Sequence, residues 1–433
     1  MNKRYFRADT IYEKSADLDC LVEAVQFYGV NKTKLDGLKK EISGLYISKN
    51  LDELVRNSHL AARHMKEVGL FDACTPLIDT STTAPDRYEV KFVVKEHKAF
   101  TLGAKMGVTT LGDADASLTS SKNSLTGRGE SISASFSKTI KGGNSFNFSA
   151  TKPFLGWQKY SRVSASLYRT LEDLRWNKSD LTENALLFNY SGRLGQRPIF
   201  SHAQFNMVWR SFMPQHDAPF PVREHAGHTT KFSLENSVYI DTRDRPVLAS
   251  RGAFFKVSQE YAGLLGDSVF LKHQLDLQIA APLILDTILS ASLQCAVVKS
   301  LADRSLHLLD RLYLGGPHDV RGFDMRSIGT RAETSCIGGA ASCAGAIHLY
   351  KPLYPRDMVF AHLFTSAGSV SSVRSKHRLR DIMESPRVSA GLGIAVNFKD
   401  IIRLELNYVI PLRFAAGDAC AAGLQFGAGL NFI

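Results

Sequence analysis

The sequence has no hydrophobic run long enough to form a membrane-spanning helix. Of its 433 residues, 44% are hydrophobic and 22% are charged, and the mean hydropathy is -0.11. No window offers the roughly eighteen uncharged apolar residues that a spanning helix needs, which excludes a helical membrane bundle. A membrane β-barrel is not excluded, because its polar inward-facing side chains offset its apolar outward-facing ones in any average.

Paired cysteines and metal-binding clusters are also missing. The six cysteines form no Cys-x-x-Cys pair, and no neighbouring histidine cluster gives the spacing of a zinc site. We therefore expect free thiols and no metal at Cys20, Cys74, Cys295, Cys336, Cys343 and Cys420. No nucleotide-binding loop is present either, so the sequence predicts a protein that works without a cofactor and is not an enzyme.

The chain also lacks two common targeting and binding signals. Residues 1–9 contain no apolar core, so we expect no secretory signal peptide. The net charge of +11 would suit anionic lipids or nucleic acid. No basic run interleaved with aromatic residues accompanies that charge, so nucleic acid is not an expected partner.

The first hundred residues have the pattern of a small mixed domain. Residues 1–20 are polar and are expected to be a flexible segment. Apolar residues then predict a strand from Leu21, a helical face from Lys32 and a second helix that Asn50 caps. Two further strands follow, the last with clear alternation from Tyr88 to Val94. The order strand–helix–helix–strand–strand predicts an α+β domain over residues 21–98, although a generic packing module would give the same pattern.

From residue 99 onward, strand patterns dominate the chain. Apolar and polar residues alternate in the segments 132–136, 146–150, 163–167, 232–234, 271–277 and 402–410. Successive side chains of a strand point to opposite faces, so each segment has one apolar face and one polar face. At roughly twenty residues per strand and connection, residues 99–433 provide about sixteen strands. Lipid is the simplest cover for so many apolar faces, and closure into a barrel would remove unpaired edges.

One loop differs from the connections around it. Residues 314–323 read Leu-Gly-Gly-Pro-His-Asp-Val-Arg-Gly-Phe, and the glycines and proline exclude a regular strand. Arg321, beside Gly322 and Phe323, is typical of a loop that docks into a polar cavity, whereas the alternative is a surface turn whose arginine faces water. The run Asp-Thr-Arg-Asp-Arg-Pro at residues 241–246 is interpreted as a structural turn between strands.

Several of these motifs resemble one family. The Val320–Phe323 run is similar to the Val-Arg-Gly-Phe/Tyr signature of the outer-membrane barrel-assembly superfamily, and residues 241–244 resemble its Asp-Thr-Arg-Asp turn. Residues 364–368 (Phe-Thr-Ser-Ala-Gly) resemble its Phe-x-Asp-x-Gly strand, which Gly338-Gly339 and the strand ending at residue 352 precede. The ending Gln425-x-Gly427-x-x-Leu430-x-Phe432 resembles the mitochondrial barrel sorting signal.

The resemblance covers nearly the whole chain and points to the core barrel of the mitochondrial sorting and assembly machinery. It implies a POTRA domain at 21–98, a transmembrane barrel at 99–433 with an in-folded loop at 314–336, and a mitochondrial outer-membrane location with the N-terminal domain in the intermembrane space. The implied function is insertion of β-barrel precursors by strand pairing at a lateral seam between the first and last strands. The implied partners are these precursors, metaxin-like accessory subunits, outer-membrane lipids and inner-membrane contact-site complexes.

The resemblance also assigns candidate functional residues. The loop residues are Gly315, Gly316, Val320, Arg321, Gly322 and Phe323. The wall that faces the loop would hold His348, Ser366, Gly368 and Glu405, and the seam would hold Gly423, Gln425, Gly427, Gly429, Leu430 and Phe432. In bacterial relatives, acidic residues at the positions of His348 and Ser366 bind the loop arginine. Neither residue here is acidic, so we expect backbone carbonyls, Ser366 or Glu405 to accept from Arg321, which cannot lose its charge.

Two other functions fit parts of the sequence. A porin-like diffusion or protein-conducting channel would have the same polar inward face, with Arg321 setting ion selectivity. A porin, however, has no use for the preceding α+β domain or for a docked loop. A soluble enzyme could be imagined with Asp310, His318 and Asp319 as an acid–base cluster, but neighbouring residues on a Gly-rich loop have no fixed geometry.

Overall fold

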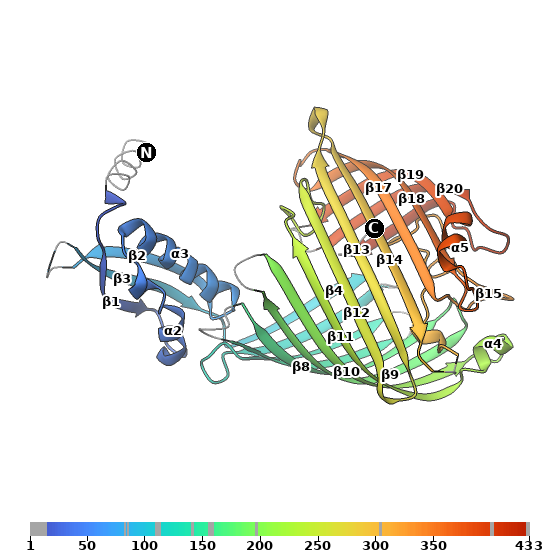
Figure 1. Cartoon of the computed structure of the whole chain (residues 1–433), viewed down its shortest axis with the longest axis horizontal. Coiled ribbons are helices and arrows are strands. Elements are labelled where there is room, and N and C mark those ends of the chain that lie inside the picture. The colour runs from blue at the N-terminus through green and yellow to red at the C-terminus, as the bar shows by residue number, and fades with distance from the viewer. Residues whose placement is uncertain are drawn as a thin grey trace.

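A computed structural model describes residues 15–81, 84, 86–108, 114–139, 143–154, 160–194, 198–302, 305–398 and 402–429. The chain forms a small N-terminal α+β unit beside a large curled sheet (Figure 1). Within the described residues, no helix has both the length and the apolar character needed to cross a membrane. The expectation of a flexible start concerns residues 1–20, of which 1–14 lie outside the described residues. Ala16, Leu18 and Cys20 form backbone hydrogen bonds with residues 49–52, and Cys20 is buried in the core of the unit, so the described end of this segment is fixed to the domain.

The N-terminal unit has the predicted order of elements. These are β1 (Leu21–Tyr28), α2 (Leu35–Glu41), the short 3₁₀ helix η1 (Leu45–Ile47), α3 (Leu51–Glu67), β2 (Phe71–Thr80) and β3 (Arg87–Glu96). Strand β3 lies at the centre of the sheet, parallel to β1 and antiparallel to β2. Asn50 caps α3 as predicted, because its side-chain oxygen accepts a 3.0 Å hydrogen bond from the Glu53 amide.

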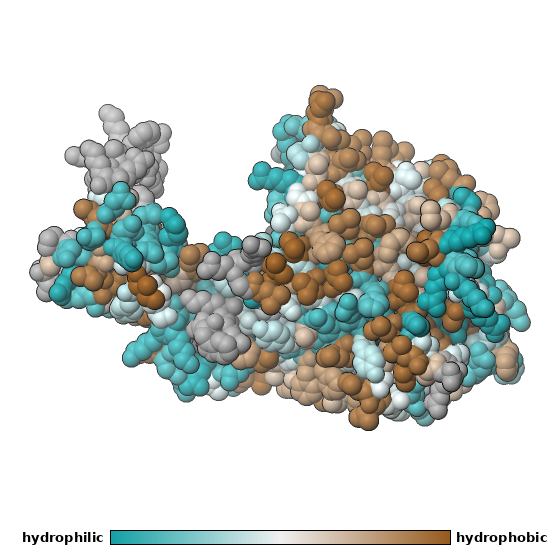
Figure 2. Space-filling model, in the orientation of Figure 1, coloured by the Kyte–Doolittle hydropathy of each residue, from teal (hydrophilic) through white to brown (hydrophobic). Residues whose placement is uncertain are grey.

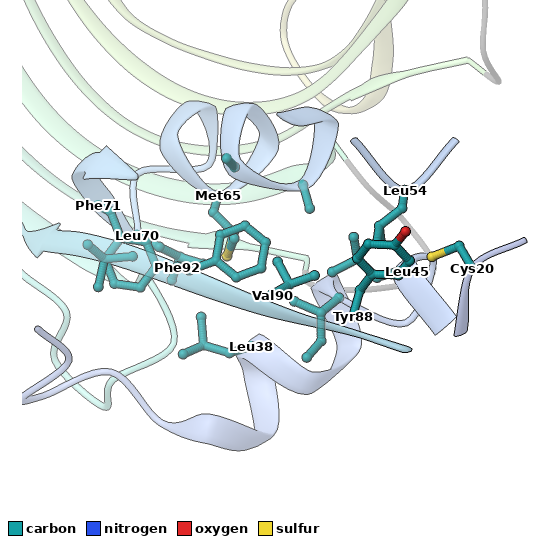
Figure 3. Close-up of a cluster of buried hydrophobic side chains, with 14 residues drawn as sticks. Cys20, Leu38, Leu45, Leu54, Met65, Leu70, Phe71, Tyr88, Val90 and Phe92 are labelled. Carbon is teal, nitrogen blue, oxygen red and sulfur yellow. The ribbon is translucent and has the colours of Figure 1, made fainter. Parts of the chain in front are cut away.

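The helices of this unit cover one face of its sheet. Leu38 from α2, Leu54 and Met65 from α3, and Val90 and Phe92 from β3 are all fully buried. Figure 3 shows these side chains converging between the helices and the strand. The unit therefore has a hydrophobic core of its own. It forms because the apolar faces of the helices and of the strands, set by their sequence periodicities, pack against each other.

The remainder of the chain forms one antiparallel sheet of sixteen strands. Each strand pairs with its neighbours in chain order, as in an up-and-down barrel. The strands are β4 (Phe100–Val108), β5 (Ala114–Asn123), β6 (Ser131–Thr139), β7 (Asn144–Pro153), β8 (Arg162–Leu174), β9 (Ser179–Arg193), β10 (Ile199–Pro214), β11 (Gly227–Asp241), β12 (Gly252–Gly266), β13 (Phe270–Pro282), β14 (Ile288–Ser300), β17 (Ala341–Pro352), β18 (Val359–Ser371), β19 (Arg387–Phe398), β20 (Ile402–Arg413) and β21 (Gly423–Gly429).

The two faces of this sheet differ in the way the alternation predicted. Large apolar side chains such as Phe148, Leu167 and Leu424 are exposed on the outer face, and Figure 2 shows apolar residues spread over the strands. Polar residues such as Ser233, Glu405 and Asn407 are buried on the inner face. The predicted fold class, an α+β domain followed by an all-β barrel of about sixteen strands, is confirmed.

The expected closure of the barrel is not met. The ends of the sheet are β4 and β21, and the described residues of these two strands do not pair with each other. The described part of β4 ends at Val108 and that of β21 at Gly429. Within these described parts, each end strand has a paired neighbour on one side only.

The connections carry the remaining elements. Short helices α4 (Phe220–Arg223), η2 (Ile284–Asp286) and α5 (Arg378–Glu384) lie between successive strands. The long connection between β14 and β17 contains η3 (Leu308–Asp310) and the two-stranded β15 (Arg331–Ala332) and β16 (Ser335–Cys336). The turn after β11 is structural, as predicted: Arg243 donates to both carboxylate oxygens of Asp241, at 2.9 and 2.8 Å.

The expectation of six free thiols is wrong for one pair. Cys295 on β14 and Cys343 on β17 face each other in register and form a disulfide, with Cα atoms 4.1 Å apart. Cys20, Cys74, Cys336 and Cys420 are free. Strand pairing brought together two cysteines that are 48 residues apart in sequence, which a search for local cysteine motifs does not detect.

Candidate functional site

The loop at residues 314–323 folds inward against the barrel wall. Val320, Arg321 and Phe323 are completely buried. Asp319 stabilises the turn, because its Oδ1 accepts hydrogen bonds from the amides of Gly315, at 3.1 Å, and Val320, at 2.7 Å. Leu314, Val320 and Phe323 pack with Ile328, Ala344 and Val370, so apolar contact joins the loop to strands β17 and β18.

Two glycines allow this close approach. Gly322 has a φ of +79°, and a Cβ atom there would lie 2.9 Å from Cγ1 of Val409 on β20. Gly368 on β18 is the matching position on the wall, because a Cβ atom there would lie 2.5 Å from Cγ2 of Val320. A larger residue at either position would push the loop away from the wall.

Arg321 is held by a buried carboxylate. Its Nη2 and Nε atoms donate to Oε2 of Glu405, at 3.0 and 3.2 Å, and both side chains are fully buried. Its backbone amide donates to the Ser366 hydroxyl at 3.2 Å, and its guanidinium lies 5.0 Å from the centre of the Phe364 ring. Glu405 therefore provides the carboxylate that is missing at the positions of His348 and Ser366.

A network of polar side chains surrounds Glu405. Arg403 forms a second ion pair with it, and the Asn407 amide donates to its Oε2 at 2.9 Å. These three residues occupy alternate positions of β20 and therefore share its inner face. Two cations and an amide around one carboxylate compensate its buried charge and fix its orientation, with the hydrogen bonds concentrated on Oε2.

Histidines complete the wall on β17 and β18. His348 stacks on His362 with ring centres 5.5 Å apart, and the two Nδ1 atoms lie 3.3 Å from each other. Nε2 of His362 is 2.8 Å from Oδ1 of Asn407, which links the histidines to Glu405. Tyr350 stacks on both histidine rings and hydrogen-bonds Arg403. One continuous network thus runs from Tyr350 to Arg321.

Four members of this network were missed in the sequence: Tyr350, His362, Arg403 and Asn407. Arg403 and Asn407 had a visible signal, since both alternate with Glu405 on the polar face of one strand. His362 had none, because its contact with Asn407 spans 45 residues and depends on how β18, β19 and β20 pair.

The loop also contacts the last strand. The Gly322 amide donates to Oε1 of Gln425 at 3.1 Å, and Phe323 forms a β-bridge with Cys420. Gly423, Gly427 and Gly429 lie on the same strand as Gln425. Leu430 and Phe432 lie outside the described residues. Loop, wall and final strand thus meet at one place, where the sheet ends.

The acid–base cluster considered for an enzyme is not assembled. Asp310 is paired with Arg210 at 2.8 Å and accepts from Ser268 at 3.1 Å. Asp319 is engaged by loop amides, as described above. Each carboxylate therefore stabilises the local fold.

Comparison with known proteins agrees with this architecture. The chain is 35% identical to the "Sorting and assembly machinery component 50 homolog" of Mus musculus, covering 96% of this chain and 91% of the relative. It is 34% identical to the Homo sapiens homolog over the same shares. The "SAM50-like protein CG7639" of Drosophila melanogaster is 28% identical, covering 98% of this chain and 97% of that protein.

A solved structure and a family model add to these relatives. The crystal structure of BamA from Haemophilus ducreyi lacking POTRA domains 1–3 has a TM-score of 0.77 at 15% identity, covering 95% of this chain and 84% of that one, and so shares the fold. The model of the Omp85 superfamily domain matches residues 124–432. The sixteen-stranded sheet and the preceding α+β unit thus match a known architecture, and the chain belongs to the Omp85 superfamily.

Proposed function

We propose that this protein inserts β-barrel precursors into the mitochondrial outer membrane by pairing their strands with its own sheet edges. The observation that carries the proposal is the junction between β4 and β21, whose described residues leave both edges unpaired. An unpaired edge presents a row of backbone N–H and C=O groups, which is the template that strand addition uses. The energy comes from folding of the precursor, and no cofactor takes part.

The loop is proposed to hold the final strand in position for this exchange. Gly322 and Phe323 contact Gln425 and Cys420, and the pair between Arg321 and Glu405 fixes the loop to β20. Gly423, Gly427 and Gly429 contribute no side-chain pairs to the ladder, which favours separation. The functional residues are then the loop, the wall residues Ser366, Gly368 and Glu405 with His348 beside them, and the final strand together with Leu430 and Phe432.

The domain boundaries, location and partners are part of the same proposal. It assigns residues 21–98 to a POTRA-like domain in the intermembrane space, to which residues 16–20 are hydrogen-bonded, and residues 99–433 to the barrel, with the loop at 314–336. Support comes from relatives named as components of a sorting and assembly machinery. The partners proposed are barrel precursors, metaxin-like accessory subunits, outer-membrane lipids and inner-membrane contact-site complexes.

Depletion of the protein separates this function from that of a diffusion channel. If it is an insertase, newly imported barrel precursors remain unassembled and protease-sensitive, whereas loss of a channel reduces metabolite flux and leaves assembly intact. The buried loop favours the insertase, because a diffusion channel has no use for a loop that is fixed to its wall through Arg321 and Phe323. Normal assembly of every tested precursor after depletion would refute the proposal.

A further inference from the structure

The N-terminal unit contacts the large sheet through a buried histidine. His64 on α3 is 2% exposed, and its Nδ1 lies 2.5 Å from Oε2 of Glu41, the last residue of α2, which is 1% exposed. On its other side, Nε2 of His64 lies 3.0 Å from the backbone amide nitrogen of Tyr160, in the turn between β7 and β8. The rings of His64 and Tyr160 also pack edge to face, with centres 4.3 Å apart.

These contacts select one tautomer of the neutral ring. The Tyr160 amide can only donate, so Nε2 of His64 must accept and carries no proton. The proton of the neutral ring therefore lies on Nδ1, where it is donated to the Glu41 carboxylate. Glu41 thus selects the tautomer that can accept from the barrel turn, in the way that a carboxylate orients a histidine in metal and catalytic sites.

The geometry of Tyr160 fits this role. Its φ of +65° is unusual for a residue with a side chain and is maintained where the surroundings impose it. The guanidinium of Arg193, at the end of β9, lies 5.4 Å from the centre of the Tyr160 ring on the barrel side. Tyr160 is therefore held from both sides, with its amide directed at His64.

The two parts also meet at the connection after β5, through one backbone hydrogen bond and one exposed ion pair. The Lys34 amide donates to the Gly127 carbonyl at 2.8 Å, and Arg128 pairs with Asp36 at 2.6 Å, both between the N-terminal unit and the turn after β5. The Arg128 and Asp36 side chains are 46% and 54% exposed, and exposed pairs contribute little. The Arg128–Asp36 pair therefore adds little, whereas the contact at Tyr160 and the hydrogen bond to the buried Gly127 are shielded from solvent.

We propose that His64, oriented by Glu41, is a positioning residue that holds the N-terminal domain at the first strands of the barrel. The contact fixes the domain to the turn that precedes β8 and leaves the β21 end of the sheet without this restraint. A precursor received by the domain is then presented at the β4 side of the junction. This role rests on the proposed insertase function, whereas the contact itself can be measured independently of function.

The test measures the distance between domain and barrel in the full-length protein in lipid nanodiscs. Spin labels are placed at K39C in α2 and R356C after β17, both exposed, in a background where Cys74 and Cys420 are replaced by serine. The parent protein is expected to give one narrow distance distribution. Arg128→Ala, which removes only the exposed pair at the same interface, is the matched control and should remain narrow.

Two variants remove the buried contact from opposite sides. Glu41→Leu/His64→Leu replaces both buried polar groups with apolar ones, so the domain is expected to keep its fold, which circular dichroism checks. Tyr160→Pro deletes the donor amide and, because proline fixes φ at about −65°, also moves this residue out of its φ of +65°. Both changes displace the contact from the barrel side and leave the interior of the N-terminal domain untouched. Tyr160→Ala, which keeps the amide, is the control. Both contact-deleting variants should broaden the distance distribution. The separate variant His64→Gln retains an acceptor for the Tyr160 amide, so its distribution should stay narrow.

The outcomes separate the contact from its function. A narrow distribution in Tyr160→Pro would overturn the proposal, even if the leucine pair unfolded the domain. A broadened distribution with an unchanged rate of precursor assembly would overturn the positioning role and leave the insertase function standing. Broadening together with slower assembly in both variants, and neither effect in Arg128→Ala, supports the proposal.

Discussion

The two ends of the sixteen-stranded sheet are restrained by different parts of the chain. At the β4 end, the N-terminal unit contacts the turns after β5 and β7 through Gly127 and Tyr160. At the β21 end, the in-folded loop contacts Gln425 and Cys420. One end is therefore attached to a domain outside the sheet and the other to a loop inside it. Two edges with separate restraints can move apart without disturbing the interior strands.

Locking the two ends together should have the largest effect. Cysteines are placed at outward positions of the end strands, L102C or M106C on β4 with L424C or F426C on β21, all exposed in the open junction. Oxidation should stop precursor assembly, because the edges can no longer admit a strand, and reduction should restore it. Assembly is followed by protease resistance of an imported precursor.

The matched control for this experiment lies in the interior of the sheet. Leu277 on β13 and Leu293 on β14 are register partners on the same outer face. A disulfide between L277C and L293C should leave assembly unchanged. If the locked β4–β21 junction assembled precursors at the normal rate, separation of the ends would not be the mechanism.

Removing the loop arginine should weaken only the β21 end. Arg321→Ala leaves the buried Glu405 with fewer cationic partners, and breaking a buried pair costs about 3–5 kcal/mol. We expect strong loss of precursor assembly with normal membrane integration, and a smaller loss for Arg321→Lys, which cannot present a planar fork. Arg331→Ala is the control within the same connection, since that side chain hydrogen-bonds the Thr334 carbonyl nearby. Equal activity in Arg321→Ala and Arg331→Ala would contradict the assigned role.

Filling the space at the loop should give an intermediate effect at the same end. Gly322→Ala places a side chain at a φ of +79° and close to Val409, which costs about 1–3 kcal/mol. Increased protease cleavage within residues 314–336 and partial loss of assembly are expected. Gly417→Ala provides a comparison, because its φ is also positive and a Cβ atom there meets only Arg331, at 3.9 Å. If both substitutions behaved alike, backbone strain alone would explain the result.

The smallest effect is expected at the β4 end, where Glu96 finishes β3 just before the barrel begins. Its carboxylate accepts from the amides of Asn31, Lys32 and Thr33. Partial burial raises the pKa of Glu96. The hydrogen bonds from these amides lower the pKa by a larger amount, so the pKa of Glu96 lies below its ordinary value. A carboxyl group whose pKa is lower in the folded state than in the unfolded state stabilises the fold at a pH above its unfolded-state pKa. This stabilisation is lost as the pH falls through the folded-state pKa.

Hydrogen exchange in the full-length protein measures this contribution. Glu96→Gln should speed exchange at Asn31, Lys32 and Thr33 near neutral pH, with a loss of about 1 kcal/mol typical of a hydrogen bond to a partly exposed group. The difference between Glu96→Gln and the parent protein should shrink in acid, as the parent carboxyl becomes protonated. Glu89→Gln, a neighbouring carboxylate of β3, is the control. Equal exchange rates in the parent protein and Glu96→Gln would show that the Glu96 hydrogen bonds do not stabilise residues 31–33.

Much of the fold was predictable because its signals are local. Asn50 caps α3 through a contact three residues away, and the strands of the barrel follow from alternation within each segment. Part of the site was predictable for the same reason: Arg321 lies in a glycine-rich loop, and Glu405 lies on the polar face of β20. Its other partners were not, since His362 reaches Asn407 only through the pairing of three strands.

The sequence by itself determined the class of the fold and the number of strands, because side-chain periodicity acts residue by residue along the chain. The tertiary structure decided three further features: that Glu405 binds Arg321, that Cys295 bonds Cys343, and that His64 meets Tyr160. Each of these contacts joins residues between 48 and 96 positions apart in sequence. Such contacts depend on strand register and domain placement, which are set by packing of the whole chain. A pattern within a short segment of sequence therefore does not reveal which distant residue is the partner.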